Sequence, residues 1–392
     1  MNKGKIIFYS TPAYGHISAS FEIMRAYVEY GCQVIFYSTE SFREAIEKTG
    51  VEYRAYNFDE SRLDLTVGNK ILKLEDTILS FTSELTEGLI QEARSINPDM
   101  IFHDNVAMWG RVVAKTLNVH AVCIHSFPIV PSLFSQGMLA YTKQFGGLMW
   151  KDMMVMPHII KMRKLIHKKY PGVKLSLLSD TLNHENTNIF TFPKFLQPGY
   201  RKLKDKYYFL GPGLLNPDYY YGQKASDNQV EDGIIFVSLG TVFQNNINLY
   251  KKILDQFKET AYPVLISMSK ENEQKLRSSV SIPSNVKICN FVKQGEVLDH
   301  AILYIGAGGM NSVCQAVHRR VPCLLFPQQG EQHITAERIQ RMGLGRLSRD
   351  FNHILIDAEK LLKDYHPDER FYHYFEKPDF KRMIRYVEKR MR

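Results

Sequence analysis

Cysteine is scarce in this sequence and forms no closely spaced pairs. The chain has five cysteines in 392 residues, at positions 32, 123, 289, 314 and 323, mostly within apolar runs. None of them shows the CxxC spacing of a redox motif or a zinc site. We therefore expect buried free thiols in a cytoplasmic protein rather than a disulfide framework.

Long hydrophobic runs are also missing. No stretch approaches the roughly 20 apolar residues that a membrane-spanning helix needs, and residues 1–10 enter a strand-like run without a cleavable signal pattern. The composition, 44% hydrophobic and 23% charged, is that of a soluble globular protein. A chain of this length can form two domains, each with its own core.

Acidic residues do not balance the basic ones, and the net charge is +9. Much of the excess comes from residues 161–174 and 381–392. We interpret both segments as solvated helix faces, with weak contact to an anionic membrane surface as the alternative. No recognised nucleic-acid motif accompanies the charge, so we expect no nucleic-acid partner.

Short apolar runs alternate with helical patterns along most of the chain. Strands are expected at 6–10, 33–38, 100–102, 121–125, 188–193, 233–238, 264–267, 302–305 and 323–326. Helices are expected at about 18–31, 42–49, 59–97, 109–117, 253–257, 311–317, 334–343 and 380–391. The Met-rich segment 126–171 is expected to be irregular. This alternation is typical of doubly wound α/β sheets, which bind ligands at the carboxyl ends of their strands.

A polar segment containing proline and glycine separates two halves of similar architecture. We predict an N-terminal domain at 1–208, a linker at 209–231, a second domain at 232–378 and a final helix at 379–392.

A glycine-rich turn, GAGG at 306–309, follows one of the strands of the second half and precedes a helix. Such a turn lets the backbone approach a ligand, and the positive end of the helix dipole suits an anion such as phosphate. The spacing is not that of the dinucleotide fingerprint GxGxxG, and a purely structural turn explains these glycines equally well.

The longer string around this turn carries a resemblance. GGMNS, VPCLLFPQQGEQ, ITAERI and GLG occur in this order between 308 and 345. They resemble the donor-binding signature of nucleotide-sugar glycosyltransferases, in the macrolide-glycosyltransferase branch of the UDP-glucuronosyltransferase-like superfamily. The resemblance implies the GT-B fold: two facing, doubly wound Rossmann-like domains, the first for the acceptor and the second for the donor, with a C-terminal helix that crosses back onto the first.

His16 is the candidate general base. An imidazole can accept a proton from an acceptor hydroxyl at neutral pH, although a histidine in a loop is more often a bystander. The loop that carries it, PAYGH after a strand, resembles the base-bearing loop of the family.

Asp104 is the candidate partner of this base. A carboxylate bonded to one imidazole nitrogen fixes the tautomer and stabilises the imidazolium. The segment PDMIFHDNVAMWG resembles the Asp-bearing strand end of the family, with Asp104 in the matching position. A helix cap before Val106 is the alternative role.

The resemblance also implies which residues of the second half contact the donor. Glu331 and Gln332 correspond to the acid–amide pair that reads the sugar hydroxyls. A carboxylate accepts from hydroxyls, and an amide both donates and accepts, although a polar helix start explains this pair as well. The other matching positions are Gly240, Thr241, Val292, Gln294, Ala307, Gly308, Gly309, Asn311, Ser312 and Gln315.

Two of these positions depart from the family pattern. Ala307 stands where histidine usually reaches the diphosphate, and Gln315 stands where glutamate usually contacts the ribose. Losing a donor to a charged phosphate weakens binding by roughly 1.5–3 kcal/mol, so Ala307→His is expected to tighten the binding of a UDP-sugar.

The Met-rich segment supplies candidates for the acceptor pocket, namely Met138, Met149 and Met153. Methionine adapts to varied apolar ligands, but ordinary core packing is the alternative role.

Together these features predict an inverting, metal-independent hexosyltransferase. It would move a hexose, with UDP-glucose as the expected donor, to a hydroxyl of a small apolar acceptor such as a macrolide or another natural product. We find no Asp-x-Asp pair in a suitable place and no His/Cys cluster, and expect no metal and no cofactor besides the co-substrate. A catalytically idle nucleotide-sugar-binding protein and a lipid-directed transferase are the alternatives, and the protein is expected to be a monomer or a homodimer.

Overall fold

The computed structural model describes residues 3–58, 71–129, 153–173, 184–203, 205–213, 215–216, 218–221, 231–240, 246–328 and 330–391. The chain forms two compact units. Unit 1 comprises Met1–Thr191, Gln197–Gly213 and Pro378–Arg392, and unit 2 comprises Phe192–Leu196 and Leu214–Lys377. Among the described helices, none is both long and apolar enough to cross a membrane.

Unit 1 is built on a parallel sheet in the order β3-β2-β1-β4-β5-β6-β7. Its strands are β1 (Lys5–Tyr9), β2 (Gln33–Ser38), β3 (Glu52–Ala55), β4 (Met100–Asp104), β5 (His120–His125), β6 (Thr187–Phe190) and β7 (Tyr207–Phe209). The chain proceeds from β1 toward one edge and then crosses to β4 and the other edge. The carboxyl ends of the neighbouring strands β1 and β4 therefore meet at the point where the direction reverses.

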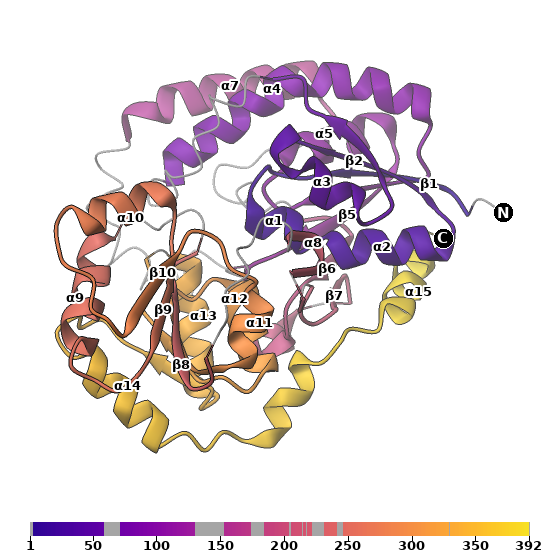
Figure 1. Ribbon diagram of the computed structural model, residues 1–392. Helices are drawn as coiled ribbons and strands as arrows, with labels where there is room; N and C mark the ends of the chain where they lie inside the picture. Colours follow the sequence, from indigo (N-terminus) through magenta and orange to yellow (C-terminus); the bar gives the residue numbers. More distant parts are fainter. Residues whose placement is uncertain are drawn as a thin grey trace. The chain divides into compact units, whose positions relative to one another are not determined.

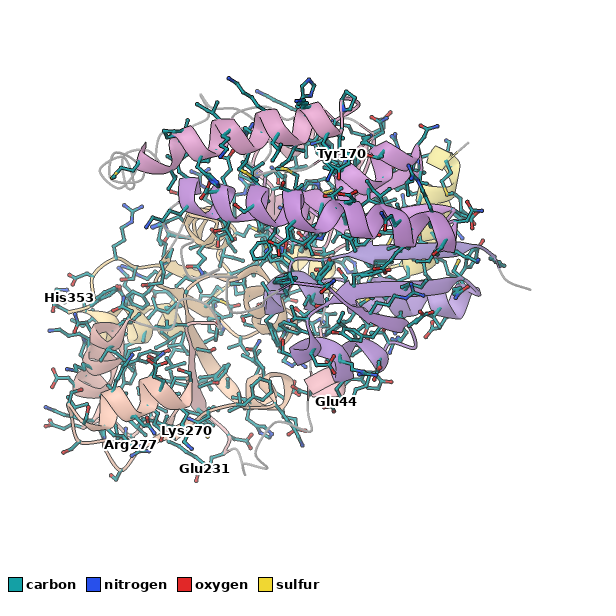
Figure 2. The ribbon with its side chains drawn as sticks, turned by 90° about the horizontal axis from the view of Figure 1, so that it is seen from above. Glu44, Tyr170, Glu231, Lys270, Arg277 and His353 are labelled. Atoms are coloured by element: carbon teal, nitrogen blue, oxygen red, sulfur yellow. The ribbon has the colours of Figure 1, made fainter. Side chains whose placement is uncertain are left out.

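Helices cover both faces of this sheet (Figure 1). They are α1 (Tyr14–Ser18), α2 (Phe21–Tyr30), α3 (Arg43–Glu47), α4 (Ile71–Ile96), α5 (Met108–Leu117), α7 (Met156–Lys169) and α15 (Phe380–Met391). Helix α4 packs against α5 and α7, and α15 packs against α2 on the other face. Figure 2 shows α7 running alongside α4.

Alternate strand residues form the core beneath α4, α5 and α7. Ile7, Tyr9 and Ile101 from the strands join Ile159 and Ile166 of α7 in one buried cluster. Such alternation is what a sheet covered on both faces requires.

Unit 2 contains a second parallel sheet, in the order β10-β9-β8-β11-β12-β13. Its strands are β8 (Ile234–Ser238), β9 (Val264–Ser267), β10 (Val286–Cys289), β11 (Ala301–Gly306), β12 (Cys323–Leu325) and β13 (Gly345–Leu347). Its helices are α8 (Asp218–Tyr221), α9 (Ile247–Phe257), α10 (Lys270–Arg277), α11 (Gln294–Asp299), α12 (Met310–His318), α13 (Gly330–Arg341) and α14 (Ile354–Lys363).

Both sheets confirm the predicted doubly wound α/β class, but several elements differ from the prediction. The segment expected to be irregular contains the regular helix α7. The short strands β3, β7, β10 and β13 were not predicted, and β7 rather than β6 forms the edge of the sheet of unit 1. Strand β7 has only three residues, all partly exposed, so it lacks the buried apolar run that marks a central strand.

Close packing of α5 on the sheet depends on one glycine. A Cβ atom at Gly110 would lie 2.7 Å from Cβ of His103 and 2.9 Å from Cβ of Tyr9. Both neighbours belong to strands that end at the candidate site, so this glycine brings α5 close to β1 and β4.

We expect Gly110→Ala to lower the free energy of unfolding by about 1–3 kcal/mol, because the added methyl group overpacks a buried contact. Urea denaturation measures this change. Gly88→Ala is the matched control, since Gly88 is an exposed residue of α4 with no atom near its missing Cβ. There the same substitution is expected to stabilise by about 0.5–1 kcal/mol. Equal effects at the two positions would contradict the packing argument.

Candidate active site

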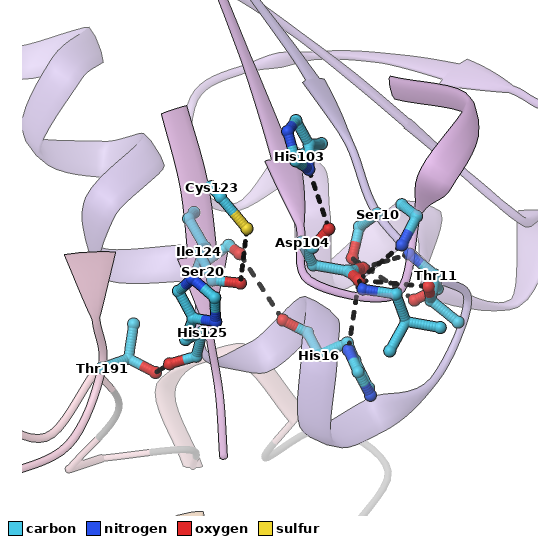
Figure 3. A network of polar contacts seen from close by, with 12 residues as sticks. Ser10, Thr11, His16, Ser20, His103, Asp104, Cys123, Ile124, His125 and Thr191 are labelled. Carbon is cyan, nitrogen blue, oxygen red and sulfur yellow. Dashed lines mark hydrogen bonds and ion pairs between the residues drawn. The ribbon is translucent and has the colours of Figure 1, made fainter. Parts of the chain in front are cut away.

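His16 and Asp104 lie together at the carboxyl edge of the sheet of unit 1. His16 is in the short helix α1 that follows β1, and Asp104 is the last residue of β4. Nδ1 of His16 is 3.4 Å from Oδ1 of Asp104 (Figure 3). The imidazole is 17% exposed and the carboxylate 1% exposed. The histidine can therefore meet solvent or a ligand, whereas the carboxylate meets only protein.

The carboxylate of Asp104 also organises the loops around it. It accepts hydrogen bonds from the backbone N–H groups of Thr11, Val106 and Ala107 and from the hydroxyl groups of Ser10 and Thr11. The sequence left two alternative roles for Asp104, either as the partner of His16 or as the cap of the chain before α5. In the structure one carboxylate occupies both positions.

Asp104 is ionised at neutral pH. Burial by itself would raise the pKa of this carboxyl group. The facing His16 and the hydrogen bonds from Thr11 and Val106 outweigh burial and hold the pKa well below its usual range. A fixed negative charge beside Nδ1 favours the tautomer with the proton on that nitrogen, which leaves Nε2 as the proton acceptor.

The contact between the two side chains is not a well-formed hydrogen bond. At 3.4 Å it is longer than the usual N–H···O distance, and Nδ1 of His16 has no hydrogen bond of normal geometry. Catalytic hydrogen bonds are often long in the absence of substrate and tighten in the reacting complex. The ring of Phe127 meets the imidazole edge-on, with the centroids 5.7 Å apart.

A second pair of histidine and carboxylate lies behind the first. Nδ1 of His103 is 2.9 Å from the backbone oxygen of Asp104, and its Nε2 is 3.5 Å from Oε1 of Glu185. Lys115 and Arg111 of α5 also approach Glu185, at 2.8 and 3.4 Å. Burial raises the pKa of Glu185, but His103 and Lys115 lower it to about 2.

This buried network excludes His103 as a rival base, because its side chain is enclosed in protein. The network joins β4 to α5 and to the residues before β6. Glu185 was not singled out from the sequence, where it lies in a polar segment without any motif.

The glycine-rich turn of unit 2 connects β11 to α12. Gly308 adopts φ +89°, which favours glycine, and a Cβ atom there would lie 3.0 Å from the backbone oxygen of Gln332. Gly309 is the N-cap of α12, and no side chain caps this helix end. The turn thus brings α12 and the start of α13 close together and presents backbone N–H groups suited to an anion.

Predicted donor residues meet around this turn. Nε2 of Gln294, in the first turn of α11, donates to Oε1 of Gln315 in α12 at 2.6 Å. Ser312 hydrogen-bonds Tyr304, whose hydroxyl donates to the backbone oxygen of Ser238. Asn311 and Glu331 are half-buried, Val292 is buried, and Gly240 is exposed at the end of β8.

A chain of amides leads from α9 to Gln332. The backbone N–H of Gln328 donates to Oε1 of Gln332 at 2.8 Å, and Nε2 of Gln328 donates to the backbone oxygen of Phe326 at 2.7 Å. Asn246, the N-cap of α9, donates to Oε1 of Gln328 at 2.9 Å. Since a backbone N–H can only donate, the side-chain oxygen of Gln332 is turned toward Gln328, and its amide N–H groups point elsewhere.

The position of Ala307 changes one expectation. Its side chain is 2% exposed and belongs to the core of unit 2. An imidazole at this position would have to displace core neighbours, which costs packing energy. Ala307→His is therefore no longer expected simply to tighten donor binding.

Several predicted residues cannot be placed in this way. Thr241, Met138 and Met149 lie outside the described residues. Met153 lies in the 3-10 turn at Met153–Val155, without a described side chain. Among the residues that are described, no group of three or more His, Cys, Asp or Glu side chains could hold a metal ion.

Known proteins are similar to this chain in sequence and in structure. Residues 251–361 match the family model of the erythromycin biosynthesis protein CIII-like C-terminal domain. The NDP-glycosyltransferase YjiC of Bacillus subtilis is 28% identical over 361 residues, which cover 88% of this chain and 84% of that protein. The demethyllactenocin mycarosyltransferase of Streptomyces fradiae is 21% identical, covering 87% of this chain and 74% of that protein.

Among solved structures, the glycotransferase of kitacinnamycin superposes with a TM-score of 0.74 at 20% identity, covering 98% of this chain and 95% of that one. This likeness confirms the predicted GT-B class for the two Rossmann-like units.

We expect Asp104→Asn to lower the free energy of unfolding at pH 7 by about 1–3 kcal/mol, because an amide cannot accept from all the groups that the carboxylate satisfies. The pKa of Asp104 is lower in the folded chain than in the unfolded one. Its contribution is thus fully present above about pH 4 and declines as the pH falls further.

Thermal unfolding between neutral and acid pH measures this effect as a difference from the unchanged protein that shrinks below about pH 4. Asp255→Asn, at an exposed position of α9, is the control and should leave the profile unchanged. A difference that grows on acidification would contradict the assignment.

Proposed function

We propose that this chain is a glycosyltransferase of the macrolide type, which moves a hexose from UDP-glucose to a hydroxyl of a small apolar acceptor, with inversion and without a metal ion. The observation that carries the proposal is the position of His16 beside the buried, ionised Asp104.

His16 supplies the base for a single displacement. Nε2 removes the proton from the acceptor hydroxyl while that oxygen forms a bond to the anomeric carbon. The bond between the anomeric carbon and the diphosphate oxygen breaks with its electron pair, and the diphosphate leaves. Attack from the face opposite the leaving group inverts the anomeric carbon. Asp104 stabilises the imidazolium that forms, through its fixed charge near Nδ1.

The turn at 306–309 supports the leaving diphosphate. Helix α12 presents N–H groups at an end that no side chain caps. These dipoles stabilise negative charge that develops on the leaving group without requiring a cation. An acceptor of natural-product type is favoured by the likeness to a mycarosyltransferase, and the Met-rich segment with Met138, Met149 and Met153 remains the proposed place for it.

Gln332 and Glu331 are proposed to read the sugar in complementary ways. The side-chain oxygen of Gln332 accepts from Gln328, so this residue offers N–H groups to a sugar oxygen. Glu331, in the first turn of α13, offers carboxylate oxygens to sugar hydroxyl groups. The amide chain through Gln328 and Asn246 holds this arrangement.

An idle nucleotide-sugar-binding protein is the second candidate. The observation that favours it is the core position of Ala307, which leaves the turn without the imidazole usual in the family. Binding without turnover would support this candidate.

Replacement of His16 tests the proposed chemistry. With UDP-glucose and a phenolic acceptor, His16→Ala is expected to lower kcat by about 10²–10⁴-fold, because the proton acceptor is lost. Calorimetry should show unchanged UDP-glucose binding. His353→Ala, at an exposed histidine of unit 2, is the control and should keep full turnover. Unchanged turnover in His16→Ala would rule out its role as the base.

Gln328→Met tests how the sugar is read. It preserves chain length but removes the link to Asn246 and the bond to the backbone oxygen of Phe326. Loosening the loop beside Gln332 is expected to weaken UDP-glucose binding about tenfold, on the order of one hydrogen bond. The affinity for UDP, which lacks the sugar, should not change.

Calorimetry with both ligands separates the two effects, and Gln274→Met, at an exposed position of α10, is the control. An equal loss of affinity for UDP and UDP-glucose would show that the amide chain serves the whole loop rather than the sugar.

A further inference from the structure

Helix α7 is attached to unit 1 by its inner face. Ile159 and Ile166 enter the core, and the buried Arg163 forms an ion pair with Glu75 of α4. At its two ends, His158 contacts Asp76 at 2.6 Å and Lys169 contacts Glu87 at 2.6 Å. Helix α7 therefore pairs with Glu75, Asp76 and Glu87 of α4.

The outer face of α7 carries three lysines that differ from Arg163 and Lys169 in their ion pairing. Lys161, Lys164 and Lys168 are exposed and follow the spacing of one helical stripe. Among the described residues, no carboxylate forms an ion pair with any of the three, in contrast to Arg163 and Lys169. Within the described parts of the chain, the positive charge on this side therefore has no carboxylate partner.

Large apolar side chains border the same stripe. Ile160 is 40% exposed, Leu165 is 47% exposed, and Met154, just before the helix, is 89% exposed. These are three of the seven large hydrophobic side chains that are exposed in the described parts of the chain. Such a concentration within twelve positions contrasts with the scattered apolar residues of an ordinary surface.

Lysines and apolar side chains on one helix face match the chemistry of an anionic lipid surface. Ammonium groups lie at the level of the lipid phosphates, while the aliphatic groups enter the boundary of the acyl chains. A nucleic acid would satisfy the charge, but this face offers it no aromatic side chain for stacking.

We propose that the outer face of α7, defined by Met154, Ile160, Lys161, Lys164, Leu165 and Lys168, docks on a membrane surface that contains anionic lipids. The helix lies flat on the surface and does not cross it, since the face is a single stripe on a helix whose other side is buried in unit 1 (Figure 2). Docking would bring the unit that contains His16 to apolar acceptors dissolved in the bilayer. The lipid interaction itself does not depend on the proposed glycosyl transfer.

Vesicle flotation of the full chain tests the proposal. The protein is expected to float with vesicles of phosphatidylcholine and phosphatidylglycerol, and to remain behind with vesicles of phosphatidylcholine alone. Because each lysine near an anionic surface contributes about fivefold, the variant Lys161→Gln/Lys164→Gln/Lys168→Gln should lose on the order of 100-fold in partitioning. Ile160→Ser/Leu165→Ser should lose the part of the binding that resists high salt.

A control with the same change in charge is available on α15, which packs against α2 on the opposite face of the sheet. Lys381→Gln/Arg385→Gln/Lys389→Gln should keep its binding to anionic vesicles. If the two triple variants lost equal amounts of binding to anionic vesicles, the binding would depend on net charge alone, and the proposal would be overturned. The proposal would also be overturned if the unchanged protein failed to float with anionic vesicles at low salt. It would be overturned as well if the α7 triple variant lost binding to DNA but kept its binding to anionic vesicles. Far-UV circular dichroism, measured in parallel, should be the same in all variants and confirms that they are folded.

Discussion

The carboxylate of Asp104 is the interaction on which the rest of the candidate site depends. Loops that follow β1 and β4 each bring polar N–H groups to one buried point, where they would be unsatisfied without an acceptor. An ionised carboxylate satisfies these groups and is itself kept ionised by them. The same charge then faces His16. The carboxylate that satisfies the loops at the end of the sheet is therefore also the group that faces Nδ1 of His16 and favours a proton on that nitrogen.

Double use of one carboxylate explains why the site can be both rigid and reactive. The buried pair of His103 and Glu185 secures β4 from behind, since it joins the backbone oxygen of Asp104 to α5. Gly110 lets α5 approach closely enough for this to occur. His16 lies in a short helix and its ring is partly exposed, whereas the carboxylate of Asp104 is buried. The charge of Asp104 is held in place on a strand, and the proton acceptor lies beside it on a short helix. This arrangement favours proton transfer.

Much of the architecture could be predicted because it depends on local pattern. Central strands such as Val264–Ser267 are continuous apolar runs, and α15 has the predicted bounds to within one residue. Edge strands such as β7 are short and half-exposed, so their pattern is not distinct from that of a loop. A solvated helix face was expected at 161–174, but the start of α7 at Met156 was not, because lysine and histidine interrupt the apolar stripe of this helix. Only contact with α4 shows which face of α7 is buried. The same limit applies to Glu185 and to the bond between Asn246 and Gln328, which joins residues 82 positions apart.

The neutral pair of Gln294 and Gln315 bears on which nucleotide the site prefers. A carboxylate at position 315 would offer two charged oxygens to the two ribose hydroxyls. The single side-chain oxygen of Gln315 already accepts from Gln294, and the residue is 2% exposed. Gln315 therefore has less capacity to accept from a ribose than a glutamate would have. Because the 2′-hydroxyl is what distinguishes ribose from deoxyribose, the proposed donor site would rely on the base and the sugar, more than on the ribose, to select its donor.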